Sequence, residues 1–341
     1  MSAGQLFAVA IVILIISFIF SIPNSSNIGK TKLTTNIVTA PDLSNSLVVY
    51  TFGDLKKKFF PEFHAKHRNF TFPFLQTTTT INVSILQQYK FNSSGVGSAV
   101  WDGSAVLSTF LARRGDVVFG ADANPGKPHV VVEIGAGQGL VSITSAMILT
   151  KLHHVGARVY ATDGDASCLV QAQTNVDRHL NLTLNTTSTN SKEQQPTPVV
   201  TITTNLVRWG HEEDARSVIA SAPATWVLAA DVVFENKAAE KKEEEEDDVL
   251  HGANQAFEAL TKTFDQLMKR KQNNALLLAY KRRRDREERF FDMMKEKGFQ
   301  SRRIKKRFVH RRYRDTFELI CFDKDGTCVQ RLGRLVEAVN E

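Results

Sequence analysis

Three glycines at alternate positions, Gly135, Gly137 and Gly139, stand directly after a short run of apolar residues. Glycine has no Cβ, so such a turn can bend tightly and let a ligand lie against the backbone. Glu133 comes two residues before the first glycine. Its carboxylate suits a ligand with a positively charged amino-acid end and would repel a pyrophosphate. The segment therefore predicts a binding turn for a ligand of that kind.

The main alternative for this turn is a dinucleotide-binding loop, whose pattern is Gly-x-Gly-x-x-Gly. Leu140 stands where that pattern requires its last glycine, so the match is incomplete. A glycine turn that binds no ligand is the remaining alternative. The strand expected before the turn and the helix expected after it favour a ligand site, because ligands bind at the carboxyl ends of strands in doubly wound sheets.

A second acidic side chain, Asp163, ends the next apolar segment. A carboxylate at this strand end can accept hydrogen bonds from both hydroxyls of a ribose. A nicotinamide cofactor uses an acid here too, so Asp163 indicates a ribose without naming the cofactor. Asp165 is expected to cap the following helix. A third acid, Asp231, follows another apolar segment that ends in Ala230.

The elements that must position these residues alternate between strands and helices, which indicates a mostly parallel sheet with helices on both faces. The expected strands are Thr78–Leu86, His129–Ile134, Ala157–Thr162, Val199–Leu206, Trp226–Ala230 and Asn274–Tyr280, with two more near Arg302–Arg307 and Thr316–Phe322. The expected helices are Ala99–Ala112, Leu140–Leu152, Ala166–Leu180, Ala253–Lys269 and Arg286–Lys297. We therefore predict a doubly wound, Rossmann-like α/β fold with a mostly parallel, seven-stranded sheet.

The N-terminal part of the chain differs in composition from the rest. Residues 6–22 are almost wholly apolar, and at about 1.5 Å of helical rise per residue they just reach across a hydrocarbon core of roughly 30 Å. No Lys or Arg precedes them, although a signal peptide normally has one there. We expect a transmembrane anchor or signal-like segment over 1–27, a linker and N-terminal extension over 28–95, the α/β domain over 96–325 and a tail over 326–341.

Composition places the chain among ordinary globular proteins, with 42% apolar residues and three cysteines in no metal-ligand spacing. We expect no disulfide framework and no metal site, and a buried free thiol at Cys168, which together favour a reducing compartment. The net charge of +7 is uneven, because Lys281–Arg314 is strongly basic and Glu243–Asp248 is acidic. The basic stretch can bind nucleic acid or an anionic membrane, although a solvated helix face explains it more simply.

Several motifs, taken in order, resemble those of the protein-lysine methyltransferases of the seven-strand class, also called methyltransferase family 16. The resemblance covers roughly Thr78–Phe322, and each motif alone is weak, whereas the set is specific. The motifs are Val100-Trp101-Asp102 followed by Leu107 and Leu111, Glu133-x-Gly-x-Gly-x-Gly, Thr162-Asp163, Asn175, Arg208-Trp209-Gly210 and Ala230-Asp231-Val232-Val233-Phe234.

The resemblance implies that the chain binds S-adenosyl-L-methionine and transfers its methyl group to a lysine-bearing protein substrate. It implies that Glu133 and the glycines line the methionine end of the donor, that Asp163 holds the ribose, and that Asp231 is the catalytic residue facing the amine. Trp209 would pack near the adenine and Trp101 beside the donor, with ordinary core packing as the alternative for both. The expected donor-binding residues are Trp101, Glu133, Gly135, Gly137, Gly139, Asp163, Trp209 and Ala230.

Two departures from the family pattern leave the substrate open. Phe234 stands where the family usually has Tyr, and Tyr280-Lys281-Arg282 stands where many members have an acid before the Arg. Methylation of arginine, RNA or a small molecule is therefore an alternative, and so is a membrane-tethered scaffold without catalysis. Nucleic acid is disfavoured, because no Asn/Asp-Pro-Pro-Tyr signature follows Ala230. The oligomeric state cannot be derived from these patterns.

Two sequence signals disagree about the location of the protein. Lys30 and Lys32 follow the apolar segment 6–22, so the positive-inside bias places the C-terminal side in the cytosol, where the methyl donor is made. We therefore expect a membrane anchor, in the endoplasmic reticulum, with a cytosolic catalytic domain; a cytoplasmic protein or one of the secretory pathway is the alternative. Asn-x-Ser/Thr sequons, which favour a lumenal protein, begin at Asn24, Asn69, Asn82, Asn92, Asn181 and Asn185.

Overall fold

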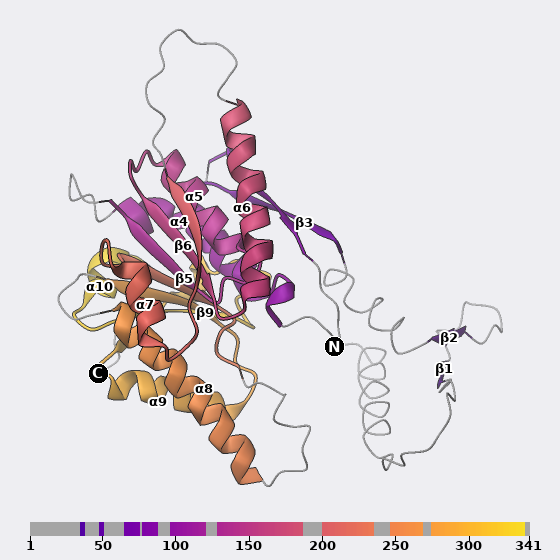
Figure 1. The fold of residues 1–341 in the computed structure, drawn as a ribbon, viewed down its shortest axis with the longest axis vertical. Helices are drawn as coiled ribbons and strands as arrows, with labels where there is room; N and C mark the ends of the chain where they lie inside the picture. Colours follow the sequence, from indigo (N-terminus) through magenta and orange to yellow (C-terminus); the bar gives the residue numbers. More distant parts are fainter. Residues whose placement is uncertain are drawn as a thin grey trace. The chain divides into compact units, whose positions relative to one another are not determined.

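The computed structural model of the protein describes residues 35–37, 48–50, 65–75, 77–87, 96–120, 128–186, 200–234, 246–268 and 274–337. The chain forms two compact units, Met1–Pro61 and Glu62–Glu341. In the first unit, strand β1 (Thr35–Ile37) pairs antiparallel with β2 (Val48–Tyr50). The second unit contains the other described elements, including the large sheet in Figure 1.

A seven-stranded, mostly parallel sheet forms the second unit's centre and confirms the predicted fold class. Its order is β10-β11-β9-β8-β5-β6-β7, with parallel pairing from β9 to β7 and antiparallel pairing at β10 and β11. All residues of β5, β8 and β9 are buried, as expected for apolar strands covered on both faces. The strands are β5 (Val130–Ile134), β6 (Arg158–Asp163), β7 (Thr201–Leu206), β8 (Trp226–Ala230), β9 (Ala275–Tyr280), β10 (Gln300–Arg303) and β11 (Glu318–Asp323).

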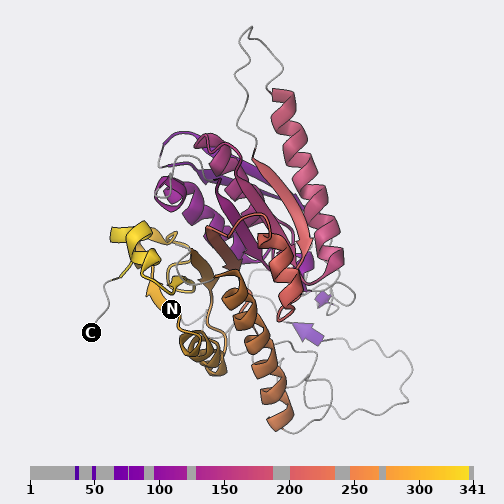
Figure 2. The ribbon, with the colours of Figure 1, turned by 60° about the vertical axis from the view of Figure 1, so that its left-hand side comes forward.

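Helices cover both faces of this sheet and build two apolar cores (Figures 1 and 2). One core takes residues from α4, α5 and α6, and the other takes residues from α7, α8 and α9. These helices are α4 (Asp102–Gly120), α5 (Leu140–Lys151), α6 (Ala166–Thr186), α7 (Glu212–Ile219), α8 (Glu246–Leu267) and α9 (Glu288–Glu296). Short 3₁₀ turns lie at η1 (Val96–Ser98), η3 (Asp285–Glu287), η4 (Lys306–Phe308) and η5 (Gly333–Leu335).

Several helices differ from the pattern-based expectation. Helix α4 continues past the expected end at Ala112, and α8 begins at Glu246, inside the acidic run. Helix α7 was not expected, although its first turn holds three acidic residues, which stabilise the positive end of a helix dipole. Helix α6 continues past its expected end at Leu180 to Thr186.

The strand expected at Thr78–Leu86 forms, but it does not join the large sheet. As β4 (Thr80–Leu86) it pairs antiparallel with β3 (His67–Pro73), a strand that the sequence pattern did not reveal. Ile81, Val83 and Ile85 on one face of β4 are buried in the core that α4 and α5 share. The hairpin therefore extends the apolar core of the second unit beyond the sheet.

The C-terminal segment also packs on this unit, through α10 (Thr327–Leu332). A disulfide joins Cys321 of β11 to Cys328 of α10, so the expectation that the cysteines form no disulfide framework was wrong for these two. They lie seven residues apart in the sequence, and the turn after β11 brings them together. Their spacing in the sequence did not indicate this pairing. Cys168 is free and buried, as predicted. The pairing removes the cysteine argument for a reducing compartment.

The described residues contain no helix with the length and apolar character needed to cross a membrane. The apolar segment 6–22 lies outside the described residues. Membrane attachment and the cytosolic location that was inferred with it therefore stay predictions.

Asn175 of α6 connects three parts of the second unit. Its Oδ1 accepts a hydrogen bond of 2.8 Å from the Leu86 backbone N–H, and its Nδ2 donates to the carbonyl oxygens of Leu86 and Gln138, each at 3.0 Å. The side chain is completely buried. It thus ties the β3–β4 hairpin and the glycine turn to the same helix.

We expect Asn175→Ala to lower the free energy of unfolding by about 2–4 kcal/mol, because it leaves buried backbone groups of Leu86 and Gln138 without partners. Chemical denaturation followed by circular dichroism measures this change. Thr174→Ala is the matched control, since Thr174 is exposed on the same helix and its hydroxyl donates to the carbonyl oxygen of Val170 within that helix. Equal midpoints for the Asn175 variant and the control would contradict the assigned role.

Candidate active site

The glycine turn follows β5 and leads into α5, as its sequence indicated. Gly135, Gly137 and Gly139 have φ values of 69°, 52° and 83°, which side chains rarely tolerate. A Cβ at Gly135 would lie 2.7 Å from a methyl carbon of Val232, and one at Gly137 would lie 3.1 Å from the carbonyl oxygen of Gly97. Three segments therefore meet at this turn only because it has no side chains.

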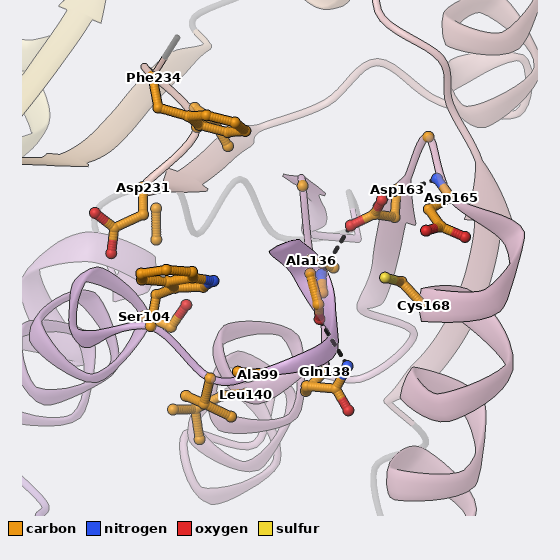
Figure 3. A pocket seen from close by; sticks show the side chains of 18 of the residues that line it. Ala99, Ser104, Ala136, Gln138, Leu140, Asp163, Asp165, Cys168, Asp231 and Phe234 are labelled. Atoms are coloured by element: carbon orange, nitrogen blue, oxygen red, sulfur yellow. Dashed lines mark hydrogen bonds between the residues drawn. The ribbon is translucent and has the colours of Figure 1, made fainter. Parts of the chain in front are cut away.

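A cavity of about 900 Å³ opens beside the turn, at the carboxyl ends of β5, β6 and β8 (Figure 3). The predicted residues that line it are Trp101, Gly135, Gly137, Asp163, Trp209, Ala230 and Asp231. Glu133 and Gly139 are not among its lining residues. Lining residues that the sequence reasoning did not select include Gln138, Cys168 and Arg283.

Asp163 lies at the end of β6 with its carboxylate at the cavity (Figure 3). Its two oxygens accept hydrogen bonds from the backbone N–H groups of Gly137, at 2.9 Å, and Asp165, at 3.0 Å. Burial raises the pKa of Asp163, and these two hydrogen bonds oppose the shift. A carboxylate has about four acceptor positions, so Asp163 can still accept from two ribose hydroxyls. Asp165 itself caps α6 through Ser167, as predicted.

Glu133 is buried beneath the turn and faces α5. Its carboxylate accepts hydrogen bonds from both the backbone N–H and the hydroxyl of Ser142, in the first turn of that helix. Burial raises the pKa of Glu133 to about 8, despite these hydrogen bonds. The family resemblance implied that Glu133 lines the methionine end of the donor. Glu133 does not line the cavity, so that role stays a prediction.

Asp231 follows β8 with a φ of 57°, a left-handed conformation that Asp and Asn adopt more readily than other side chains. One carboxylate oxygen accepts a hydrogen bond of 2.6 Å from the Gly103 backbone N–H, at the start of α4. The other accepts from the guanidinium of Arg283, and only 5% of the Asp231 side chain is exposed. A Cβ at Gly103 would lie 2.3 Å from the Asp231 carboxylate, so glycine is required there.

Arg283 reaches the site because the segment after β9 is held by Glu287. The buried Glu287 carboxylate accepts hydrogen bonds from the Tyr280 hydroxyl, at 2.9 Å, and the Arg283 backbone N–H, at 3.0 Å. Asp231 and Arg283 are 52 residues apart, so no local spacing reveals their contact. One indication of this region was present in the sequence, because Tyr280-Lys281-Arg282, directly before Arg283, differs from the family pattern.

Aromatic rings form another part of the cavity wall. Trp209 and Phe234 meet edge to face with their ring centroids 6.4 Å apart, and both line the cavity, as does Trp101. Such rings offer apolar surface to a flat base. Burial raises the pKa of the nearby Cys168 to about 12, so its thiol stays protonated and is no nucleophile.

Gln138 lines the cavity and has one side-chain atom without a hydrogen-bond partner among the described residues. Its Nε2 donates to the Gly97 carbonyl oxygen at 2.7 Å, whereas its buried Oε1 has no hydrogen-bond partner within the described part of the chain. A buried acceptor of this kind suits a ligand that brings a donor. A ribose acid, an apolar wall, a free acceptor and a turn without Cβ atoms together fit S-adenosylmethionine.

A seven-stranded sheet with this glycine turn and an acid at the end of β6 defines the fold of the S-adenosylmethionine-dependent methyltransferases, and the chain has that fold. It belongs to the lysine methyltransferase family, whose sequence model matches residues 80–297. This match confirms the resemblance that the sequence motifs indicated.

Two curated relatives of similar sequence also carry methyltransferase names. The chain is 30% identical over 200 residues to mouse protein-lysine methyltransferase METTL21E, which covers 59% of the chain and 62% of the relative. It is also 30% identical over 200 residues to a human putative methyltransferase-like protein 21E pseudogene, which covers 59% of the chain and 56% of that sequence. The match thus spans less than two thirds of either relative.

Among solved structures, a human methyltransferase 10 domain containing protein has 13% sequence identity and a TM-score of 0.39. The likeness covers 64% of this chain and 83% of that one. It is too remote to bear on the substrate.

We expect Asp163→Ala to weaken the binding of S-adenosylmethionine by about 1.5–3 kcal/mol, the contribution of hydrogen bonds to a charged group. Isothermal titration calorimetry measures it, with Asp177→Ala, an exposed change on α6, as the control. Unchanged affinity in the Asp163 variant, or tighter binding of NAD than of S-adenosylmethionine, would show the assignment to be wrong.

We expect Glu133→Gln to flatten the dependence of stability on pH. Because the pKa of Glu133 is raised from 4.5 to about 8, the folded protein keeps a proton that the unfolded chain releases above pH 4.5. This contribution to stability is complete below pH 4.5 and is lost as the pH rises towards 8. Thermal unfolding midpoints across that range should fall less in Glu133→Gln than in the wild type. Glu258→Gln, an exposed change on α8, should keep the wild-type slope.

Proposed function

We propose that the chain is an S-adenosylmethionine-dependent methyltransferase that methylates a lysine side chain of a protein. Membership of the lysine methyltransferase family supports this activity, and so does the name of the mouse relative. The observation that carries the proposal is the position of Asp231, a nearly buried carboxylate that faces the cavity from the end of β8.

Methyl transfer to an amine needs a nitrogen lone pair aligned with the carbon that it attacks. Bound S-adenosylmethionine supplies a methyl group on a positively charged sulfur. The lysine ammonium would first release a proton to water, and the neutral Nζ would then take the methyl group while the donor leaves as a neutral thioether with the electron pair of the broken carbon–sulfur bond. Holding an amine in a fixed orientation can lower such a barrier by roughly 7–11 kcal/mol.

The site must also accept lysine as a neutral amine. A lysine with an ordinary pKa near 10.4 is protonated at neutral pH, and an unpaired carboxylate would stabilise that charged form. Arg283 already offsets the charge of Asp231 through their ion pair. Asp231 therefore orients the amine through its carboxylate, while Arg283 lowers the affinity of the site for the proton.

The proposed activity is tested by incubating the protein with methyl-labelled S-adenosylmethionine and a lysate from its own cell type. We expect label in methyl-lysine after acid hydrolysis of the proteins. Label in methyl-arginine, in RNA or in small molecules would replace the proposed substrate class. Donor binding without any labelled product would indicate a scaffold that keeps the fold alone.

We expect Asp231→Asn to lower turnover about 10- to 100-fold, equivalent to about 1.5–3 kcal/mol, with donor affinity unchanged. Asn keeps the shape and tolerates the left-handed backbone, but it loses the charge and one of the two acceptor atoms that bond to Gly103 and Arg283. Arg283→Gln should instead shift the pH profile of turnover to higher pH, because the uncompensated carboxylate would hold the lysine proton. Arg282→Gln is the matched control, since Arg282 is exposed and pairs with Glu288. Full turnover in Asp231→Asn would assign Asp231 a structural role.

A further inference from the structure

A second cavity, of about 380 Å³, lies between α4 and the segment that connects β10 to β11. It shares no lining residue with the cavity beside the glycine turn. Four arginines and one histidine line it together with a single valine, and no acidic residue does. The lining residues are Arg113, Arg307, Val309, His310, Arg311 and Arg314.

The four arginines of this basic pocket have no ion-pair partner among the described residues. Elsewhere in that part of the chain, arginines such as Arg208 and Arg303 pair with nearby carboxylates. In the basic pocket, the Nε of Arg314 is buried without any hydrogen-bond partner that the structure describes. An unpaired guanidinium nitrogen of this kind suits an acceptor that the described residues do not supply.

The positive charges act on one another across the pocket. Burial lowers the pKa of His310, and the charges of Arg113, Arg311, Arg312 and Arg314 lower it further. A neutral His310 adds no charge of its own, but its ring remains a hydrogen-bonding group. The pocket thus concentrates positive potential that no carboxylate among the described residues pairs with.

The segment that carries most of these residues is anchored to the core. Val309 and Phe317 are buried, and Tyr313 meets Phe317 edge to face at 5.9 Å. The Tyr313 backbone N–H donates to the His310 carbonyl oxygen at 2.8 Å. The pocket is therefore built on fixed backbone, which reduces the entropy lost when a ligand binds.

We propose that this basic pocket binds a compact polyanion that carries several phosphate groups. Planar guanidinium groups bind phosphate oxygens in pairs of hydrogen bonds, and four of them around one pocket exceed what a single small anion requires. The volume is that of a small-ligand site, about 300–1,000 Å³. A soluble inositol polyphosphate and a phosphoinositide headgroup share this chemistry. The proposal accounts for part of the basic stretch Lys281–Arg314 that methyl transfer does not use.

The test uses the full chain and inositol hexakisphosphate in calorimetric titrations at several salt concentrations. Arg307 and Arg311 are exposed, so the double variant Arg307→Gln/Arg311→Gln should fold normally, which unchanged binding of S-adenosylmethionine or an unchanged unfolding midpoint verifies. We expect this variant to bind inositol hexakisphosphate at least about tenfold more weakly, with a smaller salt dependence.

Arg216→Gln/Arg289→Gln is the matched control, because both arginines are exposed on α7 and α9 and the change in net charge is the same. We expect it to bind like the wild type. If both double variants bound inositol hexakisphosphate equally weakly, the lower net charge would explain the loss, and the proposal would be overturned. Absence of binding in the wild type, or competition by polyglutamate as strong as by inositol hexakisphosphate, would overturn it too.

Sedimentation with vesicles distinguishes the two sources of phosphate. Selective binding to vesicles with phosphatidylinositol bisphosphate over vesicles with phosphatidylserine, lost in Arg307→Gln/Arg311→Gln, would assign the pocket to a lipid headgroup. Tight binding of the soluble compound without vesicle binding would assign it to a soluble ligand. Either result supports the site and is independent of the proposed methyl transfer.

Discussion

The turn between β5 and α5 can exist only without Cβ atoms, and the rest of the site depends on this constraint. Val232 after β8 and Gly97 before α4 occupy the space that side chains at Gly135 and Gly137 would need. The same turn presents the Gly137 N–H to Asp163. Close approach of backbone to backbone thus brings together the ends of three strands and leaves a cavity between them.

Three carboxylates around this turn have different surroundings and therefore different properties. Glu133 is buried against α5, where a raised pKa of about 8 favours its neutral form at neutral pH. Asp163 is partly buried, which raises its pKa, and two backbone N–H groups oppose this effect. Asp231 is held by one backbone N–H and one guanidinium. Burial, hydrogen bonding and ion pairing thus give the three carboxylates distinct environments, one inside the fold and two at the cavity.

Arginine is used in two contrasting ways in the second unit. Arg283 is fixed by the Glu287 anchor and paired with Asp231, so its charge serves the site beside the glycine turn. The arginines of the basic pocket have no such partner among the described residues, although Val309 and Phe317 anchor the supporting segment in the core. A paired guanidinium tunes a neighbouring group, whereas an unpaired cluster on rigid backbone is suited to an external anion.

Most strands and helices of the large sheet, the glycine turn, the acid after β6 and the family could be predicted from the sequence, because these depend on local periodicity and on residues adjacent in the chain. Only the tertiary structure decided that β4 pairs with β3, that Cys321 bonds to Cys328, and that Arg283 reaches Asp231. It also turned Glu133 away from the cavity and towards Ser142. Each of these depends on the direction of a side chain or on contact between separate elements, and the order of residues along one element encodes neither.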